Sequence, residues 1–325
     1  MILVTGATGF IGRQMCLYLN QIGYKIRGTF RGNAPPSDYP SDILWVNIGE
    51  IGPDTSWDQA LEGVHYVIHL AGLAHQIGTK GNGILNEFLK INTKGTENLV
   101  KQISKHYTIR RFVFISSLSV YDHKNNETIN ELTLCNPVSD YGHSKYEAEK
   151  VIQDILKSTN TDWCIIRPSL VYGAGNPGNM ERLQCLILRR LPLPFARIDN
   201  KRSFIFVGNL VDAISKCVFH PSASREIYLV SDGFDLSTKD LVTKIGSVIG
   251  RKVVLFSLPI VLLKIMGIIG DYLNKAIHVS LGVDTYSIEK LISSFTIDSS
   301  LIRNNLNWIP PFSIEEGLMA MFSKK

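Results

Sequence analysis

The sequence VTGATGFIG at residues 4–12 decides the fold. It follows a short apolar run and precedes a stretch whose apolar residues recur at helical spacing. In its GxxGxxG spacing, Gly6 can form a tight turn, Gly9 lets the backbone approach a pyrophosphate, and Gly12 lets a helix pack against a strand. The amides that begin such a helix attract phosphate, and the helix dipole adds to this attraction. The motif therefore predicts a strand–turn–helix unit that binds a dinucleotide.

Strand and helix signals alternate through the first half of the chain. Apolar runs predict strands at 2–4, 24–30, 43–46, 66–70, 111–116 and 162–167, and helices are expected at 82–106 and 144–157. Short apolar strands that alternate with helices are typical of a parallel sheet covered on both faces. We therefore predict an α/β fold, a Rossmann-type doubly wound parallel sheet.

The character of the sequence changes after residue 173. GAGNPG at 173–178 predicts a loop, LPLP at 191–194 breaks regular structure, and strand signals return at 204–207 and 226–230. We expect residues 1–172 to form the dinucleotide-binding domain, with parts of 205–230 returning to it. Residues 173–325 are expected to form mainly a smaller C-terminal α/β lobe that faces the substrate.

Composition excludes several classes of protein. The 325 residues are 45% hydrophobic and 19% charged, so disorder is excluded, and at about 150 residues per domain they predict two domains. The charge, 34 − 29 = +5, suits an anionic ligand but is too small to indicate nucleic acid. Five cysteines without a CxxC spacing favour neither a disulfide framework nor a metal site. A reducing, cytoplasmic location fits best.

Two hydrophobic segments bear on membrane association. The chain opens as MILVTG, which is already strand-like and leaves no room for a signal peptide. The apolar stretch from Leu258 to Gly270 is interrupted by Lys264 and is too short to span a bilayer. We expect a buried amphipathic helix there, with peripheral membrane contact as the alternative.

The residues that follow the second strand bear on cofactor choice. A carboxylate about 20 residues after the glycine turn would bind the ribose 2′-hydroxyl of NAD, but Phe30 and Arg31 stand there. Because an arginine can accept a 2′-phosphate, NADP(H) is favoured and NAD(H) remains possible. Alternatively, Arg31 is a solvated residue that stacks on adenine. The amide of Asn47 could contact the adenine edge or cap a turn.

Tyr141 and Lys145 lie four residues apart, on one helix face, so the ammonium can approach the phenol. A nearby cation stabilises the phenolate, and we expect it to lower the tyrosine pKa from about 10. The sequence SSLSVY at 116–121 follows a predicted strand, and ligands bind at the carboxyl ends of parallel strands. These residues together predict proton exchange with a sugar hydroxyl.

With these motifs the chain resembles the extended short-chain dehydrogenase/reductase family of nucleotide-sugar epimerases, dehydratases and reductases. The stretches that carry the resemblance are TGATGFIG (5–12), HLAG (69–72), INTKGTENL (91–99), FISSLSVY (114–121), YGHSK (141–145), RPSLVYG (167–173), RSFIFVGNLVDA (202–213) and DSSLIRNNLNWIP (298–310). Together they cover nearly the whole chain.

The resemblance implies a role for each matching residue. Ser117, Tyr141 and Lys145 would be catalytic, with Ser116 and Ser119 ranked lower as the hydroxyl. The cofactor would contact Gly6, Thr8, Gly9, Phe10, Ile11, Gly12, Arg31, Asn47, Ile48, Leu70, Ala71, Gly72, Asn92, Tyr141, Lys145 and Pro168. The substrate would contact Ser117, Ser119, His75 and Arg202. Arg202 would bind the sugar nucleotide's diphosphate, unless it forms a surface salt bridge, and His69 is expected to be a packed, hydrogen-bonded histidine.

Three departures from the family patterns bear on the reaction. The missing carboxylate near Phe30 disfavours a dedicated NAD enzyme, and Arg167-Pro168 replaces the segment expected of UDP-galactose 4-epimerases. Leu118-Ser119 stands where a 4,6-dehydratase usually carries Asp-Glu, so dehydration is disfavoured. The nearest resemblance is to reductases of UDP-4-keto-6-deoxy-N-acetylhexosamines, which serve O-antigen synthesis.

Two alternatives stay open. One is a 4-epimerase of UDP-glucose or UDP-N-acetylglucosamine with tightly bound NAD, and the other is a non-catalytic dinucleotide-binding regulator. The resemblance also implies a homodimer formed through helices near 82–106 and 142–158.

Overall fold

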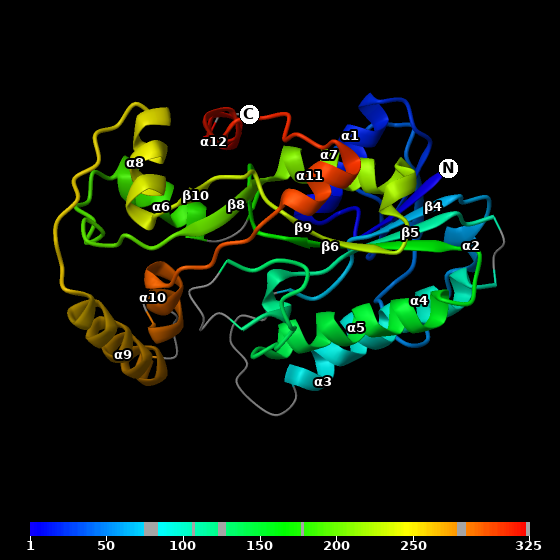
Figure 1. Ribbon diagram of the computed structural model, residues 1–325, viewed down its shortest axis with the longest axis horizontal. Helices are drawn as coiled ribbons and strands as arrows, with labels where there is room; N and C mark the ends of the chain where they lie inside the picture. The colour runs from blue at the N-terminus through cyan, green and yellow to red at the C-terminus, as the bar shows by residue number, and fades with distance from the viewer. Residues whose placement is uncertain (75–83, 106–107, 123–127, 177–178, 278–283, 323–325) are drawn as a thin grey trace.

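A computed structural model describes residues 1–74, 84–105, 108–122, 128–176, 179–277 and 284–322. Seven parallel strands form its main sheet in the order β3-β2-β1-β4-β5-β6-β9 (Figure 1). The strands are β1 (Ile2–Thr5), β2 (Ile26–Phe30), β3 (Leu44–Asn47), β4 (Tyr66–His69), β5 (Arg111–Ile115), β6 (Asp162–Pro168) and β9 (Glu226–Val230). The predicted Rossmann-type fold class is confirmed.

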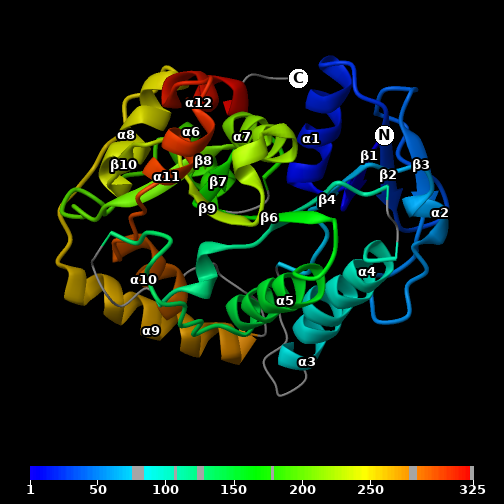
Figure 2. The ribbon, with the colours of Figure 1, turned by 45° about the vertical axis from the view of Figure 1, so that its right-hand side comes forward.

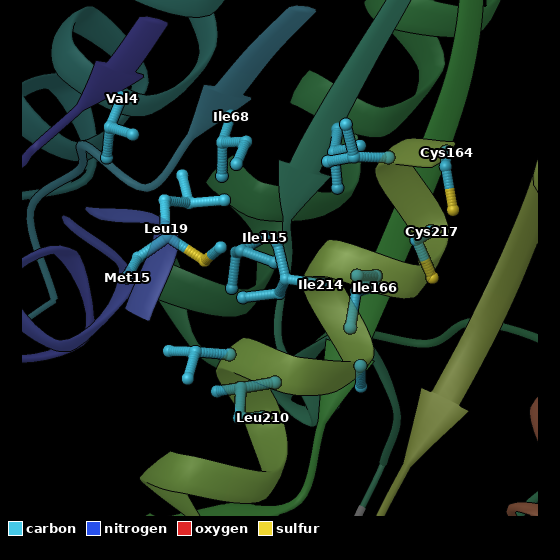
Figure 3. Close-up of a cluster of buried hydrophobic side chains, with 14 of the residues drawn as sticks. Val4, Met15, Leu19, Ile68, Ile115, Cys164, Ile166, Leu210, Ile214 and Cys217 are labelled. Carbon is cyan, nitrogen blue, oxygen red and sulfur yellow. The ribbon is translucent and has the colours of Figure 1, made fainter. Parts of the chain in front are cut away.

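Helices cover both faces of this sheet (Figure 2). One face carries α1 (Phe10–Gln21), α7 (Val207–Phe219) and α11 (Ser300–Leu306), and the other carries α2 (Asp58–Leu61), α4 (Gly95–Ile103) and α5 (Asp140–Leu156). Side chains alternate between the two faces, so Val113 packs toward α7 whereas Phe112 and Phe114 pack toward α4 and α5. Figure 3 shows part of the first layer, where Met15 and Leu19 meet Ile115 and Ile214.

The C-terminal lobe is built on a small sheet of order β10-β8-β7. Its strands are β7 (Leu170–Tyr172), β8 (Arg202–Phe206) and β10 (Asp235–Leu236), and its helices are α6 (Asn179–Leu188), α8 (Thr238–Val248), α9 (Ile260–Ile277), α10 (Thr285–Ile292) and α12 (Ile314–Phe322). A second apolar core joins these elements around buried residues such as Phe204, Val242 and Leu318. Strand β9 lies within the residue range expected for the lobe, but it pairs with β6 in the main sheet.

Two helices begin or run differently from the prediction. Helix α5 begins at Asp140, four residues before the predicted start, because Ser139 caps it by accepting a hydrogen bond from the Gly142 amide (3.0 Å). The helix predicted at 82–106 is, within its described part, α3 (Ile84–Phe88), a π-helical turn (Leu89–Lys94) and α4.

The expected burial of the apolar stretch from Leu258 to Gly270 is wrong. The stretch forms most of α9, but nearly all of its large apolar side chains are exposed. Helix α9 packs chiefly on α10, at the edge of the lobe, so only a narrow stripe is covered. In the described part of the chain, no helix combines the length and apolar character needed to cross a membrane.

Candidate active site

The glycine turn between β1 and α1 is closed so tightly that two positions admit no side chain. Gly6 has φ = 66°, and a Cβ there would lie 2.7 Å from the Ala71 nitrogen. A Cβ on Gly12 would lie 2.0 Å from the Gly6 carbonyl oxygen. These contacts explain why the turn and the helix that follows it require glycine at both places.

The start of α1 fits the pyrophosphate of a dinucleotide. Gly9 is the N-cap, no described side chain caps the helix, and no acidic residue lies in its first turn. Its amides are therefore available to an anion, and the helix dipole favours one there. Phe10, whose ring would contact a Cβ on Gly173, connects this turn to the loop after β7. Of the predicted cofactor residues, Thr8 and Ile11 belong to the same turn.

The ends of β2 and β3 form the far edge of the predicted cofactor site. Arg31 is exposed directly after β2. The Asn47 side chain donates to the Gly32 carbonyl (2.7 Å) and accepts from the Gly49 amide (2.9 Å). It therefore caps this turn, which is the second of the two roles expected for it. Ile48 follows β3 and borders a cavity of about 400 Å³.

Asn92 joins the turn after β4 to the helix that carries the predicted acid/base. Its side-chain oxygen accepts from the Leu73 amide (2.7 Å), and its nitrogen donates to the Leu73 carbonyl (3.0 Å) and to Ser144 Oγ (2.9 Å). The π-helical turn places this side chain between the two elements. Gly72 lies here too, since a Cβ on it would be 3.8 Å from Lys145 Nζ. The predicted residues Leu70 and Ala71 directly precede it.

Close packing brings Ser117 and Tyr141 together. Gly142 lies so near the 3₁₀ turn after β5 that a Cβ there would be 2.0 Å from the Ser119 carbonyl oxygen. Tyr141 lies in the first turn of α5, where the nearby Ser117 hydroxyl lowers the tyrosine pKa, whereas burial raises it more. Sequence reasoning missed Gly142, although its place beside Tyr141 in YGHSK was a signal.

The pKa of Tyr141 is therefore raised above its ordinary value, and the expected lowering by Lys145 is wrong for this structure. Burial lowers the pKa of Lys145 itself to about 7, so this lysine is only partly protonated near neutral pH. Its Nζ lies 4.1 Å from the centroid of the Phe114 ring.

Glu149, one helical turn beyond Lys145, was also missed by sequence reasoning. Its carboxylate is fully buried and raises the pKa of Lys145. Arg167 holds the carboxylate in place through Nε, which donates to Glu149 Oε1 (3.0 Å). Tyr141, Lys145 and Glu149 lie four residues apart, on one helix face, and this spacing was a signal for the carboxylate. A buried Arg167–Glu149 ion pair thus lies behind the predicted catalytic pair.

The remaining hydroxyl and histidine candidates separate clearly. Ser117 Oγ donates to Ser119 Oγ (3.2 Å), whereas the buried Ser116 Oγ has no hydrogen-bond partner among the described residues. His69 is hydrogen-bonded to Thr5 (2.6 Å) and Thr96 (3.0 Å). Burial lowers the pKa of His69 to about 3, so this histidine is a neutral core residue, as expected.

Three further predicted contacts remain: Arg202 and His75 for the substrate, and Pro168 for the cofactor. Arg202 is half-buried at the start of β8, where it pairs with Leu236 of β10. Pro168 is buried at the end of β6, opposite Val230 of β9. His75 lies outside the described residues. Within the described ranges, no three His, Cys, Asp or Glu residues are grouped to hold a metal ion.

Comparison with known proteins agrees with this architecture. The model of the NAD dependent epimerase/dehydratase family matches residues 2–231. The chain is 33% identical over 320 residues to UDP-glucose 4-epimerase of Vibrio cholerae, and the match covers 97% of this chain and 92% of that protein. It is 26% identical over 319 residues to N-acetyl-alpha-D-glucosaminyl-diphospho-ditrans,octacis-undecaprenol 4-epimerase of Escherichia coli O157:H7, covering 98% and 92%.

A solved structure shares the whole fold. UDP-glucuronic acid 4-epimerase from Bacillus cereus, in complex with UDP-glucuronic acid and NAD, has a TM-score of 0.75 at 21% identity, covering 98% of this chain and 97% of that one. The family match and the relative from Vibrio cholerae show an enzyme of the extended short-chain dehydrogenase/reductase type. Within that class, the chain belongs to the NAD dependent epimerase/dehydratase family.

Proposed function

We propose that this enzyme exchanges a hydride and a proton at C4 of a UDP-linked hexose. The observation that carries the proposal is the Ser117 hydroxyl close to Tyr141, with Lys145 one helical turn away, at the carboxyl end of β5. Two relatives matched over nearly their whole length are named as sugar 4-epimerases. These facts support C4 as the reacting carbon.

In this proposal each side chain acts on the substrate's O4. Tyr141 gives its proton to the developing alkoxide, which its raised pKa permits because the phenol stays protonated at neutral pH. Ser117 donates a hydrogen bond to the same oxygen and fixes its position. Lys145, with a pKa of about 7, can return a proton to Tyr141. A bound nicotinamide cofactor, held at the start of α1, supplies or accepts the hydride.

We propose net reduction of the C4 ketone of a UDP-4-keto-6-deoxy-N-acetylhexosamine, with NADPH preferred over NADH. Arg31 supports this because it is exposed at the end of β2, where a ribose-binding carboxylate would otherwise stand. We place the reaction in the cytoplasm, and its product in surface polysaccharide synthesis. The five unpaired cysteines, all in the described part, suit a reducing compartment.

The second candidate is a UDP-hexose 4-epimerase that retains NAD. The names of the relatives from Vibrio cholerae and Escherichia coli favour it, since both are 4-epimerases. The same three side chains serve it, because an epimerase removes and returns the hydride at one carbon.

Nicotinamide absorbance, followed with purified enzyme, NADPH and UDP-4-keto-6-deoxy-N-acetylglucosamine, distinguishes the candidates. Loss of one NADPH for each sugar reduced is the expected result. An unchanged absorbance, with NAD co-purifying and UDP-N-acetylglucosamine converted to its C4 epimer, would establish the epimerase instead. Failure of both reactions would contradict the assignment of C4 chemistry.

A further inference from the structure

Helix α9 presents a large apolar surface to solvent. It contacts the rest of the protein through a narrow stripe of Leu263, Gly267 and Gly270. A Cβ on Gly267 would lie 3.0 Å from the Thr285 Cα, which shows how closely this stripe packs on α10. Nine large apolar side chains elsewhere on α9 are between 43% and 72% exposed: Ile260, Val261, Leu262, Ile265, Met266, Ile268, Ile269, Tyr272 and Leu273.

The segment before α9 extends this surface. Leu193 donates its amide hydrogen to the Val254 carbonyl (2.9 Å), and Phe256 donates to the Leu193 carbonyl (3.0 Å), so two distant segments lie side by side. Val254, Phe256, Leu188 and Leu191, which belong to these segments, are all exposed. Both ribbon views place α9 at the edge of the C-terminal lobe, with the segment before it on the same edge (Figures 1 and 2).

The two chain segments that form most of this surface carry basic residues and no acidic ones. Residues 241–270 contain four Lys or Arg residues and no Asp or Glu, and residues 183–198 contain three Arg and again no acid. Six of these cations are exposed: Arg189, Arg190, Arg197, Arg251, Lys252 and Lys264. An acid directly follows each segment: Asp199 after the first, and Asp271, whose carboxylate accepts from the Thr285 amide (3.4 Å), after the second.

We propose that α9 and its basic border dock on the surface of an anionic phospholipid membrane. Contiguous exposed apolar surface on a folded protein marks an interaction site. An apolar helix bordered by Lys and Arg is the combination that binds lipid headgroups and the adjoining acyl chains. The helix would lie along the membrane surface, held to the protein by its Gly267 stripe, rather than cross the bilayer.

Charge also argues against a second copy of the chain as the occupant. A two-fold contact through this surface would gather Arg251, Lys252 and Lys264 of both copies in one interface, and residues 241–270 contain no acid to pair with them. The helices of the expected dimer, represented by α4 and α5, lie away from α9 (Figure 1). Anionic lipid satisfies both the apolar area and the unbalanced charge.

Sedimentation with vesicles tests the proposal. The full chain is mixed with vesicles of equal parts phosphatidylglycerol and phosphatidylcholine, and with phosphatidylcholine alone. We expect binding to the anionic vesicles, weakened by salt and by omission of phosphatidylglycerol. The combined variant Val261→Ser, Ile265→Ser and Ile269→Ser should lower the partition coefficient at least about 100-fold. These side chains are exposed, so the variant should keep the wild-type melting temperature.

Matched variants separate the apolar contribution to vesicle binding from the electrostatic one. Leu44→Ser combined with Ile309→Ser removes exposed apolar side chains elsewhere and should leave binding unchanged. Arg251→Gln and Lys252→Gln should each weaken anionic binding about fivefold. Equal binding by the α9 variant and the wild-type protein would overturn the proposal. Failure of the wild-type protein to bind anionic vesicles would also overturn the proposal. If, in addition, the α9 variant converted a dimer to a monomer, the surface would be a contact between two copies of the chain.

Discussion

Helices α7 and α9 are both strongly apolar, yet the structure treats them differently. On α7, Leu210, Ile214 and Cys217 are fully buried between the main sheet and α1. On α9, Ile265 and Ile269 are about half exposed. The comparison teaches that the apolar content of a helix predicts a surface that must be shielded from water. Which partner shields that surface depends on where the helix lies in the fold. For α7 it is the sheet of the same chain, and for α9 we propose a membrane.

The largest predicted effect separates these helices by stability. Ile214→Ala should lower the free energy of unfolding by about 2–5 kcal/mol, because it opens a cavity in a filled core. Ile265→Ala should change it by less than about 0.5 kcal/mol, since that side chain has few protein partners. Urea unfolding followed by circular dichroism measures both. Comparable losses for the two variants would contradict the exposed position of α9.

The second prediction concerns Tyr141. Tyr141→Phe removes the proton donor but keeps the ring beside Phe88, so turnover should fall at least about 100-fold while cofactor binding persists. Steady-state kinetics and fluorescence titration with NADPH give the two quantities. Tyr146→Phe, on the same helix, is the matched control and should keep its turnover. Near-normal turnover of Tyr141→Phe would remove this residue from the mechanism.

A third, smaller effect is expected at the end of β2. Arg31→Ala should weaken NADPH binding about tenfold, equivalent to about 1.4 kcal/mol, and leave NADH binding nearly unchanged. The half-buried Arg27, whose guanidinium donates to the Gln59 carbonyl, is a nearby arginine with a structural role. Equal weakening of both cofactors by Arg31→Ala would show that Arg31 does not select the 2′-phosphate.

The smallest effect is a shift of the pH profile. Glu149 raises the pKa of Lys145, so Glu149→Gln should lower that pKa from about 7. If the ammonium is the active form, activity is lost as pH rises through this pKa. The basic limb of kcat against pH should therefore move to lower pH. Glu147→Gln, at a half-buried position on the same helix, should leave the limb in place. An unmoved limb in Glu149→Gln would show that Glu149 does not set the pKa of Lys145.

The sequence predicted what local spacing determines. Gly6 and Gly12 act within a single turn, and Tyr141 and Lys145 share one helix face, so both pairs are visible without a fold. Arg167 and Glu149 meet only because β6 lies beside α5, and their pairing could not be read from spacing alone. The burial of Tyr141, which raises a tyrosine pKa that was expected to fall, likewise depends on tertiary packing.

The expected burial of α9 failed for a related reason. An apolar run of this length predicts a core helix whenever the chain itself supplies the cover. Here the fold offers only α10 and a glycine stripe. Residues 241–270 contain no Asp or Glu, and this feature could be read from the sequence alone.

The central claim is hydride transfer to C4 of a UDP-linked keto sugar, and isotope transfer tests it most directly. The enzyme is given UDP-4-keto-6-deoxy-N-acetylglucosamine and NADPH with deuterium at the nicotinamide C4 position, and the product is examined by proton NMR. The account predicts one deuterium at C4 of the product sugar in a single configuration. A product without deuterium, or with deuterium at another carbon, would contradict it.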